Sequence, residues 1–286
     1  MIGATTAQQA IDAAMRNPAM LAAAGALADN RLHEAEPLLK GRLKQNPFDV
    51  VAMRMLAELA GRIGRLQDAE ALLRRAVELA PDFLAAKSNL AMVLHKQVRS
   101  AEAIAILDEI AVAEPGSMAH ANLRAAALGR IGEYDEALEI YAAVLRTRPD
   151  HPKIWMSYGH MLKTVGRQQD CIDAYRRAIA LAPDLGEVWW SLANLKTVRF
   201  DDADMAAMTG ALDTPRLTTE NRFHLHFALG KAFDDTGDAA AAFSHYAEGN
   251  RLRRAMIDYD PADTAAQTDR AERVFTPEFL AARAGA

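Results

Sequence analysis

The chain is 286 residues long, 51% of its residues are hydrophobic and 25% are charged, and its formal net charge is −5 at pH 7. This composition indicates a folded globular protein and excludes a disordered one. The acidic balance argues against a general affinity for nucleic acid. A single cysteine, Cys171, excludes both an intramolecular disulfide framework and a cysteine-based zinc site.

The first residues do not show the basic region and apolar core of a signal peptide. The apolar stretch from Ala19 to Ala28 is too short to cross a bilayer. We therefore expect a cytoplasmic protein that makes no membrane contact. Residues 1–15 are predicted to form a short lead-in helix.

The chain is organised around an internal repeat. Five prolines recur 34 residues apart: Pro47, Pro81, Pro115, Pro149 and Pro183. A fixed period of this length indicates one supersecondary unit that has been copied along the chain. If the proline is numbered 32 in each copy, position 20 is always small and position 24 is always bulky. Small residues at positions 8 and 20 allow two antiparallel helices to pack closely, and the proline ends the second helix.

The fifth copy, residues 152–185, carries the fullest pattern: Trp155, Tyr158, Gly159, Leu162, Cys171, Tyr175 and Pro183. This pattern resembles the tetratricopeptide repeat family, W-x2-L-G-x2-Y, A-x3-F and P over 34 residues. The resemblance covers residues 16–256 and implies an all-α solenoid, a right-handed superhelix of about seven helix-turn-helix repeats. The Trp and Tyr residues at the pattern positions are expected to be buried, and Cys171 is expected to be an inert buried thiol.

Not all copies follow the pattern equally. Repeat 1 (16–49) has Asn30 in place of the glycine between the helices, and repeat 3 has Val98 there. Repeat 6 loses the pattern after Phe200, and Asp201 is predicted to cap a shortened second helix that ends near Asp213.

Repeat 7 (223–256) recovers the pattern without the proline, so its second helix is expected to run to about Asp258. Residues 257–286 are predicted to hold two short helices, 261–274 and 276–284. Because a solenoid exposes an apolar face at its end, we expect these helices to cap the last repeat.

In the tetratricopeptide repeat family the first helix of each repeat lines the concave surface, chiefly through positions 2, 5, 6, 9, 12 and 13. In repeats 2 to 5 these positions hold six Lys or Arg residues and one acid, Glu58. A surface of one charge concentrates ligands of the opposite charge, so the resemblance predicts a basic groove for an acidic segment. The alternative is an ordinary solvated helix face. The predicted groove residues are Arg54, Arg62, Asn89, His95, Lys96, Asn122, Arg130, Lys153, His160, Lys163, Trp190 and Asn194.

Trp190 directly follows Trp189 and must point to another face. It is either an anchor for a ligand or a contact between repeats, and the sequence favours neither.

No constellation of side chains predicts catalysis. The sequence contains neither a phosphate-binding P-loop nor a dinucleotide-binding glycine pattern. His224 and His226 are two residues apart and therefore lie on different faces of a helix, which excludes a joint metal site. The acidic pairs at Asp201 and Asp234 are expected to be solvated charges. We predict no catalytic residue, no metal and no cofactor in this chain.

The C-terminal third is similar to the last repeat of bacterial tetratricopeptide–sulfotransferase fusions. The similar segments are Leu229–Asp238, Ala242–Arg251 and Val274–Leu280. In those fusions the catalytic domain uses 3′-phosphoadenosine 5′-phosphosulfate, so the resemblance implies that such a domain would follow residue 286. The chain itself carries none of that domain's motifs.

Three functions are therefore predicted. The first is a protein-binding or peptide-binding scaffold that recognises an extended acidic segment. The second is the substrate-recognition region of a sulfotransferase, and the third is a structural module that self-associates into a homo-oligomer.

Overall fold

The computed structural model describes residues 9, 11–14 and 16–284. These residues are all-α, and within the described ranges no residue lies in a strand. The predicted lead-in helix falls partly outside the described residues, and residues 9 and 11–14 of it are helical. The chain divides into two compact units, Met1–Ala178 and Ile179–Ala286, which we call the N-terminal and the C-terminal unit.

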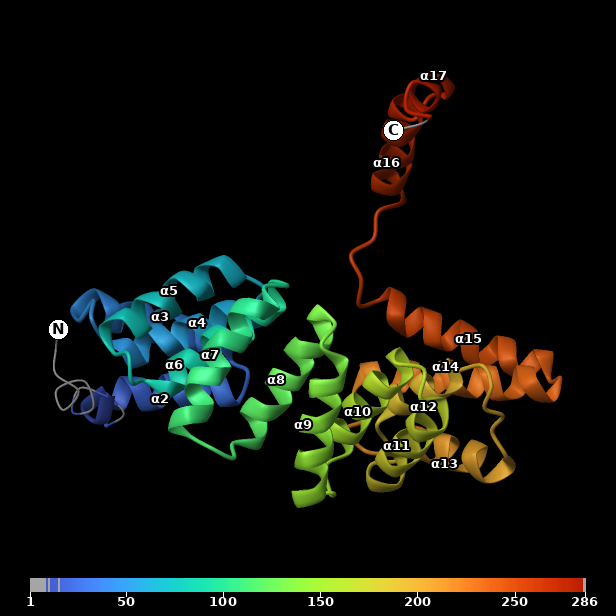
Figure 1. The fold of residues 1–286 in the computed structure, drawn as a ribbon, viewed down its shortest axis with the longest axis horizontal. Coiled ribbons are helices and arrows are strands. Elements are labelled where there is room, and N and C mark those ends of the chain that lie inside the picture. The colour runs from blue at the N-terminus through green and yellow to red at the C-terminus, as the bar shows by residue number, and fades with distance from the viewer. Residues whose placement is uncertain (1–8, 10, 15, 285–286) are drawn as a thin grey trace. The chain divides into compact units, whose positions relative to one another are not determined.

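Helix pairs follow one another along the N-terminal unit (Figure 1). Its helices are α2 (Pro18–Ala28), α3 (Leu32–Gln45), α4 (Val50–Arg62), α5 (Leu66–Leu79), α6 (Leu84–Lys96), α7 (Ser100–Ala113), α8 (Met118–Ile131), α9 (Tyr134–Thr147), α10 (Pro152–Thr164) and α11 (Gln168–Leu181), the last of which crosses the boundary. The even-numbered helices are the first helices of repeats 1 to 5. Five consecutive second helices end at Gln45, Leu79, Ala113, Thr147 and Leu181, each followed two residues later by a repeat proline. The predicted role of the proline as a stop is confirmed.

The turn between the two helices of a repeat contains one left-handed residue. Gly64 and Gly132 take φ values of 81° and 94° there, which cost glycine little. Asn30 and Val98 occupy the same place with φ values of 57° and 67°. A branched side chain in this region is strained, so Val98 is held by the helices on both sides of it.

The core of the N-terminal unit follows the repeat. The four alanines at position 20 are fully buried, as is Cys171, and burial raises the pKa of the Cys171 thiol. The predicted inert cysteine is therefore consistent with the structure. Tyr141 and Tyr175 are buried as expected, but Trp155 is only half-buried. The expectation of a fully buried Trp155 was wrong. Its indole Nε1 donates a hydrogen bond to the carbonyl oxygen of Pro149 at 2.9 Å.

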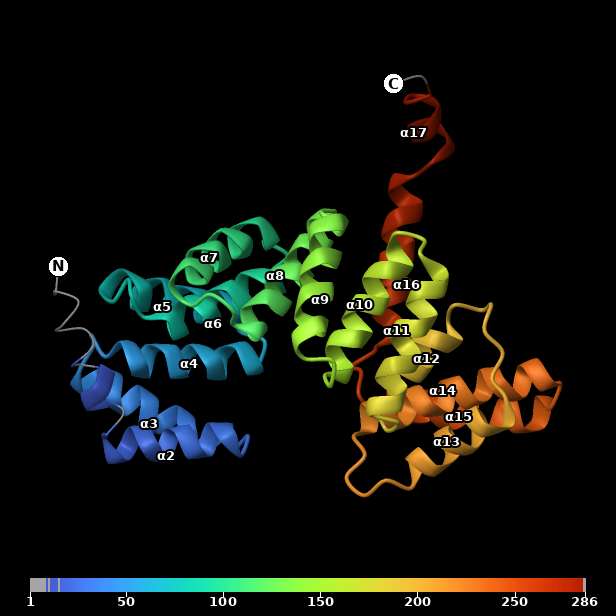
Figure 2. The ribbon, with the colours of Figure 1, turned by 60° about the horizontal axis from the view of Figure 1, so that its bottom comes forward.

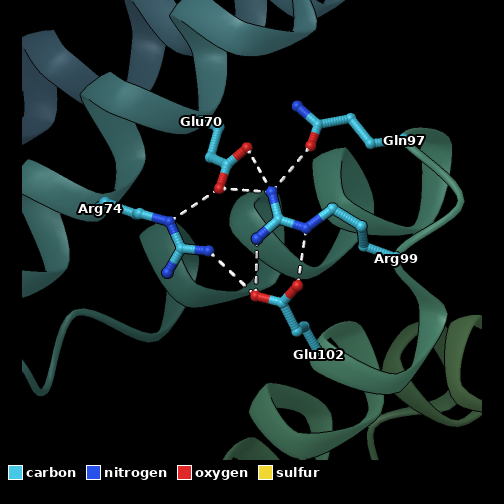
Figure 3. A network of polar contacts seen from close by, with 5 residues as sticks. All are labelled: Glu70, Arg74, Gln97, Arg99 and Glu102. Atoms are coloured by element: carbon cyan, nitrogen blue, oxygen red, sulfur yellow. Dashed lines mark hydrogen bonds and ion pairs between the residues drawn. The ribbon is translucent and has the colours of Figure 1, made fainter.

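Polar contacts join successive repeats on the surface. Arg99, at the start of α7, donates to both oxygens of Glu70 on α5 at 2.8 Å and to Glu102 on its own helix (Figure 3). Arg74 closes the network with bonds to Glu70 and Glu102. Surface ion pairs contribute about 0–1 kcal/mol each, so this network joins α5 to α7 across two repeats with a small contribution to stability.

One position departs from the apolar pattern of the first helices. Position 7 of repeat 4 is Arg124, where the pattern predicts a bulky apolar side chain. Arg124 is half-buried and pairs with Asp108 of α7 and Glu136 of α9, both at 2.7 Å. At this position an ionic contact therefore joins three helices.

The C-terminal unit begins with the irregular repeat. Its helices are α12 (Gly186–Ala193), α13 (Asp202–Leu212), α14 (Thr219–Thr236), α15 (Ala239–Arg254), α16 (Pro261–Val274) and α17 (Pro277–Ala281). Asp201 caps α13 and forms a reciprocal capping box with Asp204, which confirms the predicted shortened helix. The first helix of repeat 6 already ends at Ala193, earlier than the pattern predicts.

The pair α14 and α15 forms the best-packed part of this unit, with the two helices side by side in both views (Figures 1 and 2). Helix α15 ends at Arg254, short of the predicted Asp258. Helices α16 and α17 are present as predicted, but neither contains a buried residue. Their role as a cap therefore stays a prediction.

Candidate peptide-binding site

The candidate site is the face of the first helices that carries positions 2, 5, 6, 9, 12 and 13, here called the first-helix face. On α4 this face holds three charged residues one helical turn apart. Glu58 pairs with Arg54 at 3.5 Å and with Arg62 at 2.5 Å. Spacings of four residues bring such side chains together on a helix. Glu58, the one acid at these positions in repeats 2 to 5, is therefore shared by two arginines.

The next first helix, α6, continues this face. Arg62, Asn89 and Lys96, three of the predicted groove residues, lie around one open cavity of 220 Å³, here called the polar cavity. Leu73 of α5 also lines it. The full lining is Ala57, Glu58, Gly61, Arg62, Leu73, Asn89, Met92, Val93 and Lys96.

The charge balance of this face is positive. Lys96, Arg130, Lys153 and Lys163 make no ion pair with any residue that the structure describes. Lys96, Lys153 and Lys163 are exposed to solvent. Because Glu58 is already paired, these cations are available to an anionic ligand.

Two of the predicted groove arginines also serve the fold. Arg62 donates through Nη1 to the carbonyl oxygen of Leu27 at 2.6 Å, and Arg130 donates in the same way to His95 at 3.3 Å. Both acceptors are carbonyl groups in the last turn of the preceding first helix, where main-chain acceptors lack partners within the helix. A cation there also interacts favourably with the helix dipole. These arginines therefore join consecutive repeats.

The remaining predicted positions of the N-terminal unit are partly enclosed. His95 lies 3.2 Å from the hydroxyl of Ser100, and burial, followed by the nearby Arg130, lowers its pKa. The ring of His160 packs edge-on against Tyr175 at 5.5 Å, and burial, followed by Lys163, lowers its pKa. Asn122 is half-buried, and its Oδ1 atom has no hydrogen-bond partner among the described residues. These side chains border the face but are less open to a ligand than Lys96.

The two predicted residues of the C-terminal unit lie on α12 and at its end. Trp190 is half-buried, and its ring lies 5.5 Å from that of Phe227 on α14. This contact lies between repeats 6 and 7 and agrees with the packing role between repeats that the sequence left open for Trp190. Asn194 caps the C-terminus of α12 and is exposed.

The sequence reasoning missed an apolar part of the first-helix face, because the list of groove residues began at repeat 2. A cavity of 330 Å³, here called the apolar cavity, lies between α2, α4 and the start of α6. The sequence of repeat 1 already indicates an apolar face, because its positions 5, 6 and 9 are all apolar. The lining residues are Met20, Leu21, Ala24, Val51, Arg54, Met55, Phe83 and Ala85.

The described residues contain no group of three or more His, Cys, Asp or Glu side chains placed to hold a metal ion. Within the same part of the chain, no helix has the length and apolar character needed to span a bilayer. The predicted absence of a cofactor stays a prediction.

Antiparallel helix pairs with a 34-residue period and an open first-helix face define a helical-repeat scaffold, an architecture consistent with protein–protein interaction. A sequence model described as tetratricopeptide repeat matches residues 9–184. The chain therefore belongs to the tetratricopeptide repeat family. No curated protein sequence matches it significantly.

Solved structures show the same fold. A tetratricopeptide repeat protein from Parabacteroides merdae is 14% identical with a TM-score of 0.59, over 90% of this chain and 94% of that one. The human IFIT1 dimer with PPP-AAAA is 20% identical with a TM-score of 0.57, over 78% of this chain and 55% of that one. A double mutant of MamA RS-1 is 16% identical with a TM-score of 0.50, over 63% of this chain and 96% of that one. At these identities the likeness concerns the fold alone.

Proposed function

We propose that the N-terminal unit binds an extended acidic segment of another protein along its first-helix face. The observation that carries this proposal is the polar cavity, where Arg62, Asn89 and Lys96 of consecutive first helices surround one opening. Glu58, the one carboxylate in that lining, is already paired with Arg54 and Arg62.

The chemistry of the lining suits such a ligand. Cations without carboxylate partners attract anionic side chains and speed their capture. The amide of Asn89 can donate to and accept from a peptide backbone, whatever side chains the peptide carries. The helices that carry these groups are held in register by the arginine bonds between repeats, so little ordering is needed on binding.

Lys96 and Lys163 are the cations to change, because Arg62 and Arg130 also join repeats. The probe is a fluorescein-labelled peptide of repeated Gly-Ser-Glu, compared with the same peptide carrying Gln in place of Glu. For Lys96→Glu with Lys163→Glu, fluorescence anisotropy should show the Kd for the acidic peptide rising about tenfold. Binding by the wild-type chain should also weaken as salt is raised.

The matched control is Arg146→Glu. Arg146 is exposed on α9 and makes no ion pair with a described residue. Equal binding of the Gln peptide, or an equal loss in the control variant, would contradict the proposal.

The other two predicted functions stay predictions. The coding sequence beyond residue 286 tests whether a sulfotransferase domain follows. Sedimentation equilibrium tests self-association.

A further inference from the structure

The apolar cavity lies on the same face as the polar cavity. Met20 and Leu21 occupy positions 5 and 6 of repeat 1, and Met55 occupies position 6 of repeat 2. The same positions carry polar residues further along the solenoid, such as Ser88 and Asn89 at positions 5 and 6 of repeat 3. One helix face therefore changes from apolar to cationic along the N-terminal unit.

The two cavities are connected by α4. Arg54 lines the apolar cavity and pairs with Glu58, which lines the polar cavity together with Arg62. An apolar opening whose single charged neighbour is a cation favours an apolar side chain next to acidic ones over a basic sequence. The charges beside the apolar cavity therefore indicate which kind of peptide segment it binds.

The distance between the cavities sets a spacing for the ligand. Met55 and Arg62 are seven residues apart on α4, which corresponds to roughly 10 Å along the helix axis. A peptide in the extended polyproline II conformation rises about 3.1 Å per residue with three residues per turn, so it covers this distance in about three residues and places both side chains on the same side. The apolar cavity measures 330 Å³, many times the ~30 Å³ share of one water molecule in the liquid, so it has room for one bulky side chain.

We propose that the apolar cavity receives a large apolar side chain of the bound segment, about three residues from an acidic side chain held at Arg62 and Lys96. The partner is thus a protein segment with a bulky apolar anchor such as Phe, Leu or Met beside acidic residues. This inference rests on the proposed function and adds a sequence requirement to it. Acidic character alone then gives only weak binding.

The test uses synthetic peptides and the full chain. The anchored probe is acetyl-Gly-Ser-Phe-Gly-Ser-Glu-Ser-Gly-amide, and a second probe has the reversed sequence because the direction of binding is open. Two matched peptides replace Phe by Gly or Glu by Gln. Of the two anchored probes, the one whose sequence direction fits should bind about 10- to 100-fold more tightly than the Gly peptide in isothermal titration, as burial of one large apolar side chain predicts.

A protein variant locates the anchor. Ala24→Phe places a ring in the apolar cavity from an exposed position, whereas Ala22→Phe on the same helix changes an exposed residue outside the lining. Ala24→Phe should remove the advantage of the anchored probe and leave the affinity for the Gly peptide unchanged. Ala22→Phe should change neither. The comparison of the peptides on the wild-type chain does not depend on the folding of any variant.

The outcomes separate the two proposals. Equal affinity for the anchored and Gly peptides would overturn the anchor and leave the acidic groove standing. Equal affinity for the Glu and Gln peptides would overturn the pairing of anchor and acid. Failure of every peptide to bind would overturn both proposals.

Discussion

The indole Nε1 of Trp155 donates a 2.9 Å hydrogen bond to the carbonyl oxygen of Pro149, six residues before it. Trp189 repeats this contact with Pro183 at 2.8 Å. The proline that ends one repeat is thus bound by the tryptophan that begins the next. At these two junctions, the proline that marks the period in the sequence also accepts a side-chain hydrogen bond through its carbonyl oxygen.

The two tryptophans should differ in their contribution to stability. Trp189 is 1% exposed, so Trp189→Ala should lower the free energy of unfolding by about 3–5 kcal/mol. Trp155 is half-buried, and Trp155→Ala should cost less, about 1–3 kcal/mol. Replacement of either by Phe removes the hydrogen bond, worth about 0.5–1.5 kcal/mol, and also the part of the indole that a phenyl ring does not fill, so each cost should lie between that value and the alanine value. Urea unfolding measures these values, and a larger loss at Trp155 than at Trp189 would show that the burial difference is wrong.

Gly159 and Tyr175 should be energetically coupled. A Cβ atom at Gly159 would lie 2.5 Å from Cε1 of Tyr175, so the tyrosine ring or the helix would have to shift. Gly159→Ala should therefore destabilise the fold by about 1–3 kcal/mol.

Repeats 2 and 3 combine alanine with leucine at the equivalent positions, so in a Tyr175→Leu background the same alanine should cost much less. A double-mutant cycle followed by thermal melting measures the coupling. Additive effects would argue against the close contact.

Val98→Gly should stabilise the protein by about 0.5–1 kcal/mol. Val98 has a φ of 67°, which is strained for a branched residue, and relief of that strain exceeds the entropy lost on fixing a glycine. The matched control is Gly64→Ala, where a Cβ would meet no atom within 4 Å, so that only backbone strain changes. It should lower the melting temperature while Val98→Gly raises it. A lower melting temperature for Val98→Gly would mean that its side chain makes contacts that outweigh the strain.

The pair of His226 and His245 should make stability depend on pH. Their Nδ1 atoms are 3.0 Å apart, so one ring donates and the other accepts a hydrogen bond. Burial, followed by the neighbouring His245, lowers the pKa of His226, and burial lowers that of His245. Of the other charged groups that face His226, Glu248 opposes this shift, whereas Arg222 and Arg251 add to it.

The sign follows from proton binding. The unfolded chain takes up protons near the ordinary histidine pKa of about 6.5, whereas the folded pair takes them up only at lower pH. The contribution of the pair is therefore complete above pH 6.5 and is lost as the pH falls through this value towards the folded pKa values. Urea unfolding at pH 7.5 and 5.5 should show lower stability at pH 5.5.

His226→Asn with His245→Asn should reduce this difference. His95, His160 and His224 also have lowered pKa values and should account for the pH dependence of stability that remains in the double variant. An unchanged pH dependence in the double variant would exclude a role for the pair.

Much of the fold was predictable because the determinants are local. A proline two residues beyond a helix end, or an aspartate that caps α13, acts within a few residues of its own position, and the period repeats the signal. The half-burial of Trp155 and the ionic contact of Arg124 depend on which side chains of the adjacent repeat face them. A pattern read within one repeat does not contain that information.

The candidate site shows the same limit. The residues of the polar cavity follow from their positions in the repeat, which the resemblance supplied. The bond from Arg62 to Leu27 spans 35 residues and depends on the stagger between helices of successive repeats. The apolar cavity was missed because repeat 1 matches the pattern least, although its composition alone marks that end as different.

The most direct test of the account maps the bound peptide by methyl NMR of a chain with ¹³C-labelled methionines. Met92 lines the polar cavity, Met20 and Met55 line the apolar cavity, and Met256 is exposed in the C-terminal unit. The peptide that carries Glu without Phe should shift the Met92 signal. The anchored peptide should also shift the Met20 and Met55 signals, and the Met256 signal should stay unchanged. Saturable binding that leaves Met92 unshifted, or that shifts only Met256, would contradict the claim that the first-helix face is the binding surface.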